Sequence, residues 1–135
     1  MVLTKEPMIE ITNELQLHNK VVDFIRKYYE HAILVPGLGE IQTTSKLRCS
    51  AYLKGYRGGQ PDILILNKHA SHRGLAIELK TPNGKGRLGK NQVTLLMDLE
   101  ENGFKTLVSN DYDEVLVTLI KYFREVSDSI ETDDE

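Results

Sequence analysis

Two short apolar runs with charged residues at their edges place the strongest constraint on how this chain can fold. The first run, residues 63–66, follows Asp62, and the second, residues 75–79, contains Glu78 and is followed by Lys80. Apolar runs of this length between polar segments are typical of buried strands. The polar residues 67–73 between them predict a hairpin loop.

A symmetric hairpin loop fixes the register of the two strands. Leu66 then pairs with Gly74, and the same register places Asp62 opposite Glu78, with the two Cβ atoms about 5 Å apart. Because side chains alternate along a strand, Glu78 and Lys80 point to the same face. Two carboxylates and one amine therefore converge at one end of the predicted sheet.

Two adjacent carboxylates repel each other unless positive charge lies between them. One interpretation is a strand-end salt bridge from Lys80 to both acids. The other is a divalent cation, because two carboxylates, a backbone carbonyl and water are the hard oxygen ligands that Mg²⁺ prefers. The same oxygen-rich set disfavours zinc.

The charge distribution favours a polyanionic partner, although the formal net charge is −3. Residues 46–90 contain ten basic and two acidic residues, a local charge of +8, while residues 125–135 contain six acids and no base. An acidic metal site within a basic surface suits phosphodiester cleavage. A solvated basic face without a partner is the alternative.

The pattern predicts one α/β domain over residues 1–124, with the order α-β-β-β-α-β-α. Thr12 and Asp111 are expected to cap the first and last helices. Residues 42–59 read as basic and irregular, with room for a short helical piece. Residues 125–135 are expected to form a disordered acidic tail. The expected helices cover residues 13–30, 90–102 and the segment after Asp111, and the expected strands cover residues 32–35, 62–66, 75–80 and 104–108.

Several classes of protein are excluded by composition. No apolar run approaches the roughly 20 residues of a membrane span, and the first residues lack the apolar segment of a signal peptide. We therefore expect a cytoplasmic protein. The single cysteine, Cys49, rules out a disulfide framework and a cysteine-based zinc site. The chain has no GxxxxGK(S/T) loop and no Ser/His/Asp arrangement, so we expect neither a nucleotide cofactor nor acyl hydrolysis.

The motifs resemble those of a known nuclease family. Pro61-Asp62, followed by Glu78-Leu79-Lys80, resembles the PD-(D/E)XK signature. The wider pattern of GYRGGQPDILIL, RGLAIELKTPNGKGRLGKNQ and NGFKTLVSNDYDEVL is similar to the virus-type replication-repair nuclease (VRR-NUC) branch, over residues 14–123. The resemblance implies a restriction-endonuclease-like fold, which is a mixed β-sheet flanked by helices.

The resemblance also implies the members of an active site. Asp62, Glu78 and the main-chain carbonyl of Leu79 would hold Mg²⁺ or Mn²⁺. Lys80 would orient or help to deprotonate the attacking water, or steady the scissile phosphate.

Two further residues match family positions near the metal. Gln92 matches a helix glutamine, and Glu14 matches an acid on the first helix that often joins the site, with Glu10 as a weaker match. An ordinary surface glutamine and a helix-start glutamate are the alternatives for Gln92 and Glu14. The chain departs from the family at Gly89, where Ser or Thr often caps the helix.

Basic residues on two segments are candidates for holding the DNA backbone. Tyr52 and Tyr56 lie among the first group, where they either pack in the core or stack on unpaired bases. The six candidates are Arg48, Lys54 and Arg57, and, on the glycine-rich loop, Lys85, Arg87 and Lys90.

The implied function is that of a metal-dependent, structure-specific DNA endonuclease. We expect it to act on branched DNA as a homodimer, in the manner of a Holliday junction resolvase, because two strands require two facing sites. The alternatives are a flap, single-strand or nicking nuclease in phage or viral DNA processing, and a non-catalytic DNA-binding module with the same fold.

Overall fold

The computed structural model describes residues 10–69, 71–84 and 86–133, and its description of side chains leaves out Glu40 and residues 125–133. At its centre is a four-stranded mixed sheet with the strand order β1-β2-β3-β4. The first three strands pair antiparallel, and the fourth runs parallel to the third. They are β1 (Leu34–Pro36), β2 (Ile63–Ile65), β3 (Gly74–Leu79) and β4 (Phe104–Ser109).

The predicted hairpin register is confirmed. Ile63 pairs with Ile77 and Ile65 pairs with Leu75, which is the register that brings Asp62 opposite Glu78. The bounds differ slightly from the prediction, because β2 is one residue shorter at each end and β3 is shifted by one residue toward the N-terminus.

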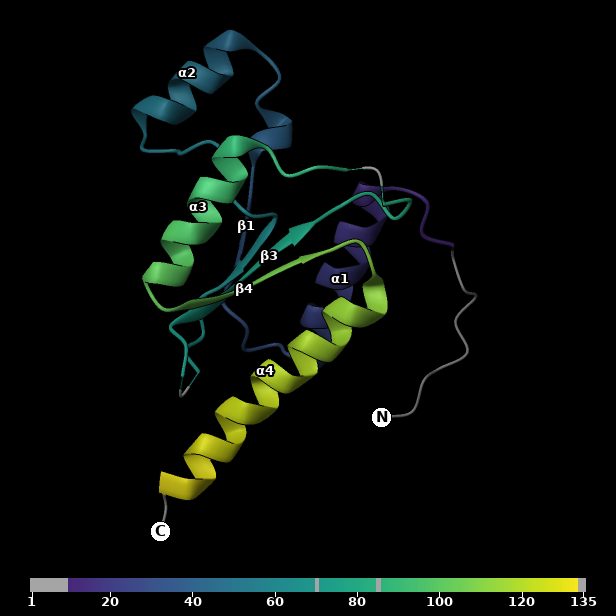
Figure 1. Ribbon diagram of the computed structural model, residues 1–135, viewed down its shortest axis with the longest axis vertical. Helices are drawn as coiled ribbons and strands as arrows, with labels where there is room; N and C mark the ends of the chain where they lie inside the picture. The colour runs from purple at the N-terminus through teal and green to yellow at the C-terminus, as the bar shows by residue number, and fades with distance from the viewer. Residues whose placement is uncertain (1–9, 70, 85, 134–135) are drawn as a thin grey trace.

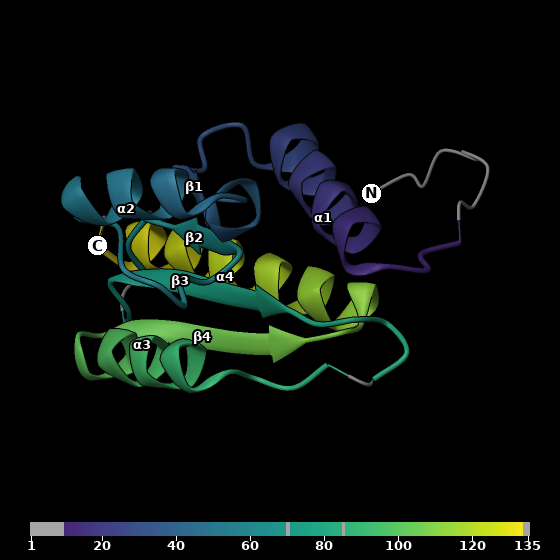
Figure 2. The same ribbon diagram turned by 90° about the horizontal axis from the view of Figure 1, so that it is seen from above.

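Helices cover both faces of the sheet (Figures 1 and 2). Helices α1 (Glu14–Tyr28) and α4 (Tyr112–Asp133) contact each other and pack on one face, while α3 (Lys90–Glu101) packs beside β4 on the other. The predicted order α-β-β-β-α-β-α is therefore confirmed.

The main core lies between the sheet and the pair α1 and α4. It is built from Leu17 and Val21 of α1, Val115 and Leu119 of α4, and the strand residues Ile63, Ile65, Leu75, Ile77 and Leu79. Because side chains alternate along β3, Ala76 and Glu78 point to the opposite face, which α3 partly covers. The charged end of the hairpin is thus turned away from the main core.

The predicted cap of the first helix is wrong by one residue. Asn13 is the N-cap, and its side chain accepts a hydrogen bond from the Gln16 N–H at 2.8 Å. Thr12 lies outside the helix, and its N–H and hydroxyl both donate to Gln16 Oε1, at 2.8 and 2.9 Å. The expected cap at Asp111 is found, since its carboxylate accepts from the Asp113 N–H.

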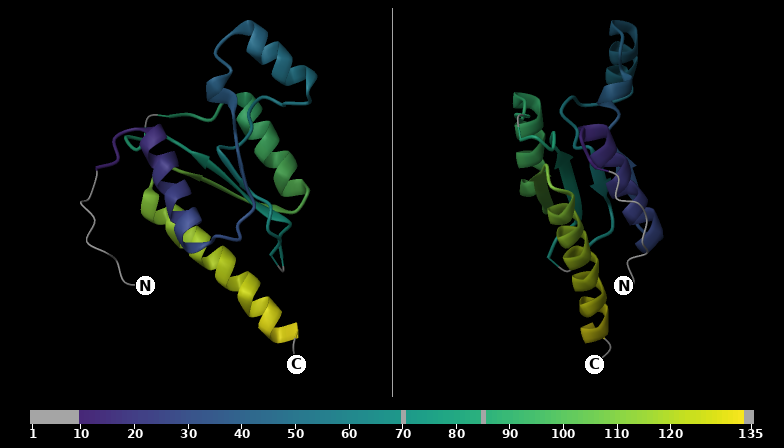
Figure 3. Two further views of the ribbon diagram at one scale, coloured as in Figure 1. Left: turned by 180° about the vertical axis from the view of Figure 1, so that it is seen from behind. Right: turned by 90° about the vertical axis from the view of Figure 1, so that its right-hand side faces the viewer.

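The segment between β1 and β2 is more regular than the sequence indicated. It holds a 3-10 turn, η1 (Gly39–Ile41), and a full helix, α2 (Ser45–Leu53). None of the residues of α2 is buried, and the helix stands clear of the sheet (Figure 3).

At the other end of the chain, α4 continues to Asp133. Disorder of the acidic tail stays a prediction, because the side chains of residues 125–133 and all of residues 134–135 lie outside the description. Among the described residues, no helix combines the length and apolarity that crossing a membrane requires.

Candidate active site

Asp62 is tied directly to the strand that carries the other charged residues. Its Oδ2 accepts a hydrogen bond from the Leu79 N–H at 2.7 Å. On the far side of β3, the Lys80 N–H donates to the Ser109 carbonyl at 2.9 Å. The main chain at Leu79 and Lys80 is therefore held from both sides, by Asp62 on one side and by β4 on the other.

Glu78 is a buried carboxylate with an unsatisfied oxygen. Its side chain is 2 % exposed, and Oε2 has no hydrogen-bond partner among the described residues. Burial, followed by the negative charge of Asp62, raises the pKa of Glu78 to about 8, although the Lys80 charge acts in the opposite direction. A carboxyl group in this environment needs a proton or a cation to compensate its charge.

Lys80 lies on the same side of β3 as Glu78, as the alternation predicted. Its Nζ is 3.7 Å from Glu78 Oε1, and its side chain is 14 % exposed. The same Nζ donates to the Arg87 carbonyl at 3.2 Å and to Gln92 Oε1 at 3.3 Å. The ammonium is therefore positioned by an ion pair with Glu78 of β3 and by hydrogen bonds to the glycine-rich loop and α3.

Gln92 links the helix to both charged residues of β3. Its Nε2 donates to Glu78 Oε1 at 2.7 Å, while its Oε1 accepts from Lys80 and from the Gly89 N–H, the latter at 2.7 Å. Gly89 is the N-cap of α3 and brings no side chain to the cap, so the Gln92 contact satisfies the Gly89 N–H itself. The described contacts rule out an unattached surface glutamine.

Glu14 is the first residue of α1 and is half-buried. Its negative charge raises the pKa of Glu78. This effect is smaller than the effects of burial, of Asp62 and of Lys80 on the same pKa. The described residues contain no group of three or more His, Cys, Asp and Glu side chains that is arranged to hold one metal ion. The charge of Glu14 is thus felt by Glu78, but Glu14 does not join Asp62 and Glu78 in a three-ligand group among the described residues.

The donor set at the centre suits a hard divalent cation. Asp62 and Glu78 offer carboxylate oxygens, Leu79 joins them along β3 through its bond to Asp62, and Glu78 Oε2 is buried without a hydrogen bond from the described residues. Magnesium and manganese are bound in proteins by one or two carboxylates, carbonyl oxygens and several waters. The residues present fit such an ion, and water or substrate would complete its coordination.

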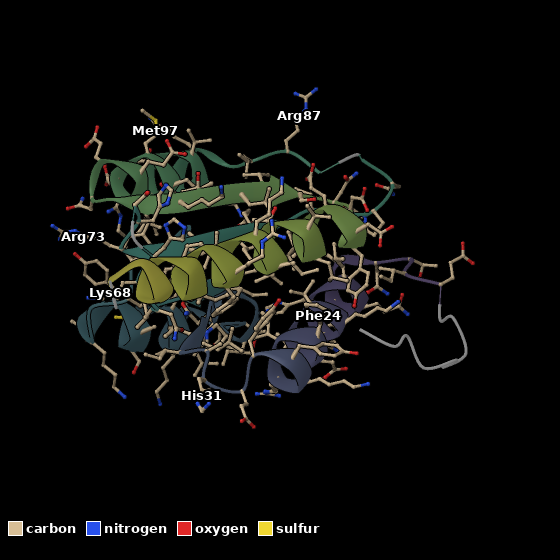
Figure 4. The ribbon with its side chains drawn as sticks, turned by 90° about the horizontal axis from the view of Figure 1, so that it is seen from below. Phe24, His31, Lys68, Arg73, Arg87 and Met97 are labelled. Atoms are coloured by element: carbon tan, nitrogen blue, oxygen red, sulfur yellow. The ribbon has the colours of Figure 1, made fainter. Side chains whose placement is uncertain are left out.

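The six predicted DNA-binding residues are found in different settings. Arg48 on α2 and Lys54 at the C-cap of α2 are exposed, and Arg48 donates to Gln42 O and Ser45 Oγ. Arg57 pairs with Asp98 of α3 at 2.7 Å, a contact that the sequence did not indicate. Arg87 and Lys90 are exposed near the start of α3, and Arg87 extends away from the molecule (Figure 4). Lys85 lies outside the described residues.

A close approach of two backbones, which sequence reasoning missed, sets the position of Gln92. Gly59 has a φ of +86°, and a Cβ there would lie 2.4 Å from the carbonyl carbon of Asn91 and 2.7 Å from the Gln92 nitrogen. The segment that leads into Asp62 is therefore packed directly on the first turn of α3. The glycine in GGQPD is the only signal of this contact in the sequence.

Replacing Gly59 with alanine should disturb this packing. We expect a loss of roughly 2–4 kcal/mol in the free energy of unfolding, because a left-handed φ and a backbone clash act together. Gly55→Ala is the matched control, since Gly55 has a φ of +99° with nothing within 4 Å of a Cβ, and should cost about 1–2 kcal/mol. Urea unfolding of both variants measures the difference. Equal losses would show that the close approach contributes nothing.

The comparisons with known proteins agree with this geometry. A mixed sheet with Pro61-Asp62 at the start of one strand and Glu78-Leu79-Lys80 at the end of its neighbour has the arrangement of PD-(D/E)XK nucleases. The family model of the VRR-NUC domain matches residues 7–110. The chain belongs to the VRR-NUC family, a nuclease family of PD-(D/E)XK type.

One solved structure, described as a VRR_NUC domain protein, superimposes with a TM-score of 0.69. Its sequence is 17 % identical, and the match covers 87 % of this chain and 93 % of that chain. At this identity the likeness supports the fold alone. A search of the curated proteins found no match.

Proposed function

We propose that the protein is a divalent-metal-dependent, structure-specific DNA endonuclease that cuts branched DNA as a homodimer, in the manner of a Holliday junction resolvase. The observation that carries the proposal is the cluster of Asp62, Glu78, Lys80 and Gln92. Their contacts place two carboxylates, an ammonium and a buried, unsatisfied oxygen at one end of β3. A structural salt bridge alone would not leave Glu78 Oε2 unsatisfied in the interior.

The proposed roles follow from these contacts. Asp62, Glu78 and the Leu79 carbonyl would hold Mg²⁺ or Mn²⁺, and a bound cation supplies Lewis-acid activation of water and offsets negative charge at the scissile phosphate. Lys80 positions the attacking water or the phosphate with its ammonium. Gln92 is a positioning residue, because it fixes Glu78 through Nε2 and Lys80 through Oε1.

Glu14 is proposed to act at the edge of the site. Its place beside the central pair suits contact with the cation through water, which Mg²⁺ retains in most protein sites. Arg87 and Lys90, before and at the start of α3, would hold phosphates of the DNA backbone together with Arg48 on α2 and Lys54 at its C-cap. Arg57 would contribute less to this grip, since its charge is already paired with Asp98.

A panel of labelled substrates tests the proposal. With Mn²⁺ or Mg²⁺, we expect paired nicks in a four-way junction, with 5′-phosphate and 3′-hydroxyl ends, and much slower cleavage of matched duplex. Faster cleavage of a flap or of single-stranded DNA would favour the alternative nucleases. Junction binding without cleavage of any substrate would indicate a non-catalytic DNA-binding module.

Light scattering tests the homodimer on the same preparation. A mass of twice 15.3 kDa at micromolar concentration is the expected result, because symmetric nicks in two strands need two facing sites. A monomer at that concentration would contradict the resolvase-like mode, whatever the cleavage activity.

A further inference from the structure

The segment between β1 and β2 forms an arm that the core does not require. We define the arm as residues 38–57, which contain η1 and α2. No residue of α2 is buried, and α2 stands away from the sheet on the side of the first turn of α3 (Figures 1 and 3). A helix that buries nothing adds little to the stability of the domain.

The arm is nevertheless held in a defined shape by its own contacts. Thr44 caps the start of α2 by accepting the Leu47 N–H at 3.1 Å. At its end, the Gly55 N–H donates to the Tyr52 carbonyl and the Tyr56 N–H donates to the Ala51 carbonyl, both at 2.9 Å. With Gly55 in the left-handed conformation, this pair of bonds is a complete Schellman motif. The end of α2 is thus presented in a fixed conformation.

The end of α2 displays the most exposed large apolar side chains of the described residues. Tyr52 is 75 % exposed and Leu53 is 77 % exposed. They lie in a basic stretch of the chain, because residues 41–61 contain Lys46, Arg48, Lys54 and Arg57 and no acid, although Arg57 is paired with Asp98 of α3. Aromatic and apolar side chains among basic residues suit nucleic acid, with charge for the phosphates and apolar surface for unstacked bases.

The base of the arm is joined to the candidate active site. The Gly37 N–H donates to the Asp62 carbonyl at 3.0 Å, and Arg57 pairs with Asp98 on α3. Asp62 follows Leu53 by only nine positions along the chain, so the end of α2 lies no more than about 30 Å from that carboxylate. This is the length of about nine stacked nucleotides, at 3.4 Å each.

From these observations we infer that Tyr52 and Leu53 contact unpaired bases at the branch point of the DNA substrate, and so give the enzyme its preference for branched over duplex DNA. The inference rests on the proposed function for its substrate, and its first test does not depend on cleavage. It also predicts that nicks fall within about nine nucleotides of the branch point.

Binding to a four-way junction with 2-aminopurine at the branch point tests the inference in EDTA, where cleavage is absent. The Tyr52→Ala/Leu53→Ala variant should lose about tenfold in junction affinity relative to duplex affinity, since stacking contributes about 1–3 kcal/mol per base. The change in 2-aminopurine fluorescence seen with the wild type should be lost with it. Tyr52→Phe should retain both effects.

Val117→Ala is the matched control, because Val117 is an exposed apolar residue on α4, outside the arm. It should bind the junction as the wild type does. Circular dichroism should show unchanged folding of the arm variant, because neither substituted side chain is buried.

The single cysteine provides an independent measurement. Cys49 is exposed on α2, three and four residues before Tyr52 and Leu53, and therefore on the same side of the helix. A benzophenone attached to Cys49 should crosslink to nucleotides at the branch point. Crosslinks spread evenly along the duplex arms would overturn the inference.

Other outcomes separate the inference from its rivals. Equal losses of junction and duplex affinity would make the arm a general backbone contact and would overturn the inference. If the arm substitutions convert a dimer to a monomer, Tyr52 and Leu53 belong to a protein interface. That result would also overturn the inference. A wild type that alters the fluorescence but cuts nothing would support the inference and contradict the proposed function. An arm variant that still cuts DNA and still prefers the junction would contradict the inference and support the proposed function.

Discussion

Asp62→Asn should reduce cleavage about a thousandfold or more while leaving the fold intact. An asparagine keeps an oxygen that can accept the Leu79 N–H, so the contact that joins Asp62 to β3 is preserved. It removes the negative charge, which a divalent cation needs from its ligands and which is worth several kcal/mol at the transition state. Single-turnover cleavage of a labelled junction in Mn²⁺ measures the loss.

Two controls make this result specific to the charge of Asp62. Asp23→Asn is the same chemical change on α1, outside the candidate active site, and should cleave at the wild-type rate. Titration calorimetry with Mn²⁺, in the absence of DNA, should show heat of binding for the wild type and little for Asp62→Asn. Normal Mn²⁺ binding by Asp62→Asn would remove Asp62 from the metal site.

The metal-free protein should become less stable as the pH rises from about 5 to 8. The pKa of Glu78 is raised from 4.5 to about 8 by burial and by the charge of Asp62. The folded protein therefore retains a proton that the unfolded chain releases. The contribution of that proton to stability is complete below about pH 4.5 and is lost as the pH rises through 8. Between these two limits the loss amounts to about 5 kcal/mol.

Urea unfolding of the wild type and Glu78→Gln in EDTA, from about pH 5 to pH 8, isolates this contribution. The amide introduced by Glu78→Gln does not titrate, so the stability of the wild type should fall relative to the variant across this range. Addition of Mn²⁺ at the upper end of the range should restore the wild type alone, because a cation replaces the proton. Parallel stability curves for the two proteins would show that Glu78 is ionised in the metal-free fold.

The register of the hairpin could be predicted because it depends on chain geometry alone. The length of the loop fixes which residues pair, and the alternation of side chains fixes which face they share. The convergence of Asp62, Glu78 and Lys80 therefore follows from their spacing in the sequence alone. The contacts of Gln92 could not be derived in this way, since the distance between α3 and the sheet depends on the close approach at Gly59.

Other features were missed because they are set by tertiary contacts or by local bonds. Tyr122 is buried because its hydroxyl donates to the Asn67 carbonyl and its ring stacks on His69, and apolar spacing alone does not select a tyrosine for the core. The arm helix α2 was expected only as a short piece, because its order comes from its two caps and no apolar face marks it. Arg57 was expected to contact DNA, while its ion pair with Asp98 joins segments 41 residues apart.

The central claim is that the residues at the end of β3 form a metal-dependent nuclease site. Cleavage of an end-labelled four-way junction by the wild type and by Lys80→Ala, with Mn²⁺ and with EDTA, tests it most directly. We expect paired nicks by the wild type with Mn²⁺ and none with EDTA, and no nicks by Lys80→Ala, although the variant still binds the junction. Equal binding by both proteins without nicking in Mn²⁺ or Mg²⁺, or equal nicking by both, would contradict it.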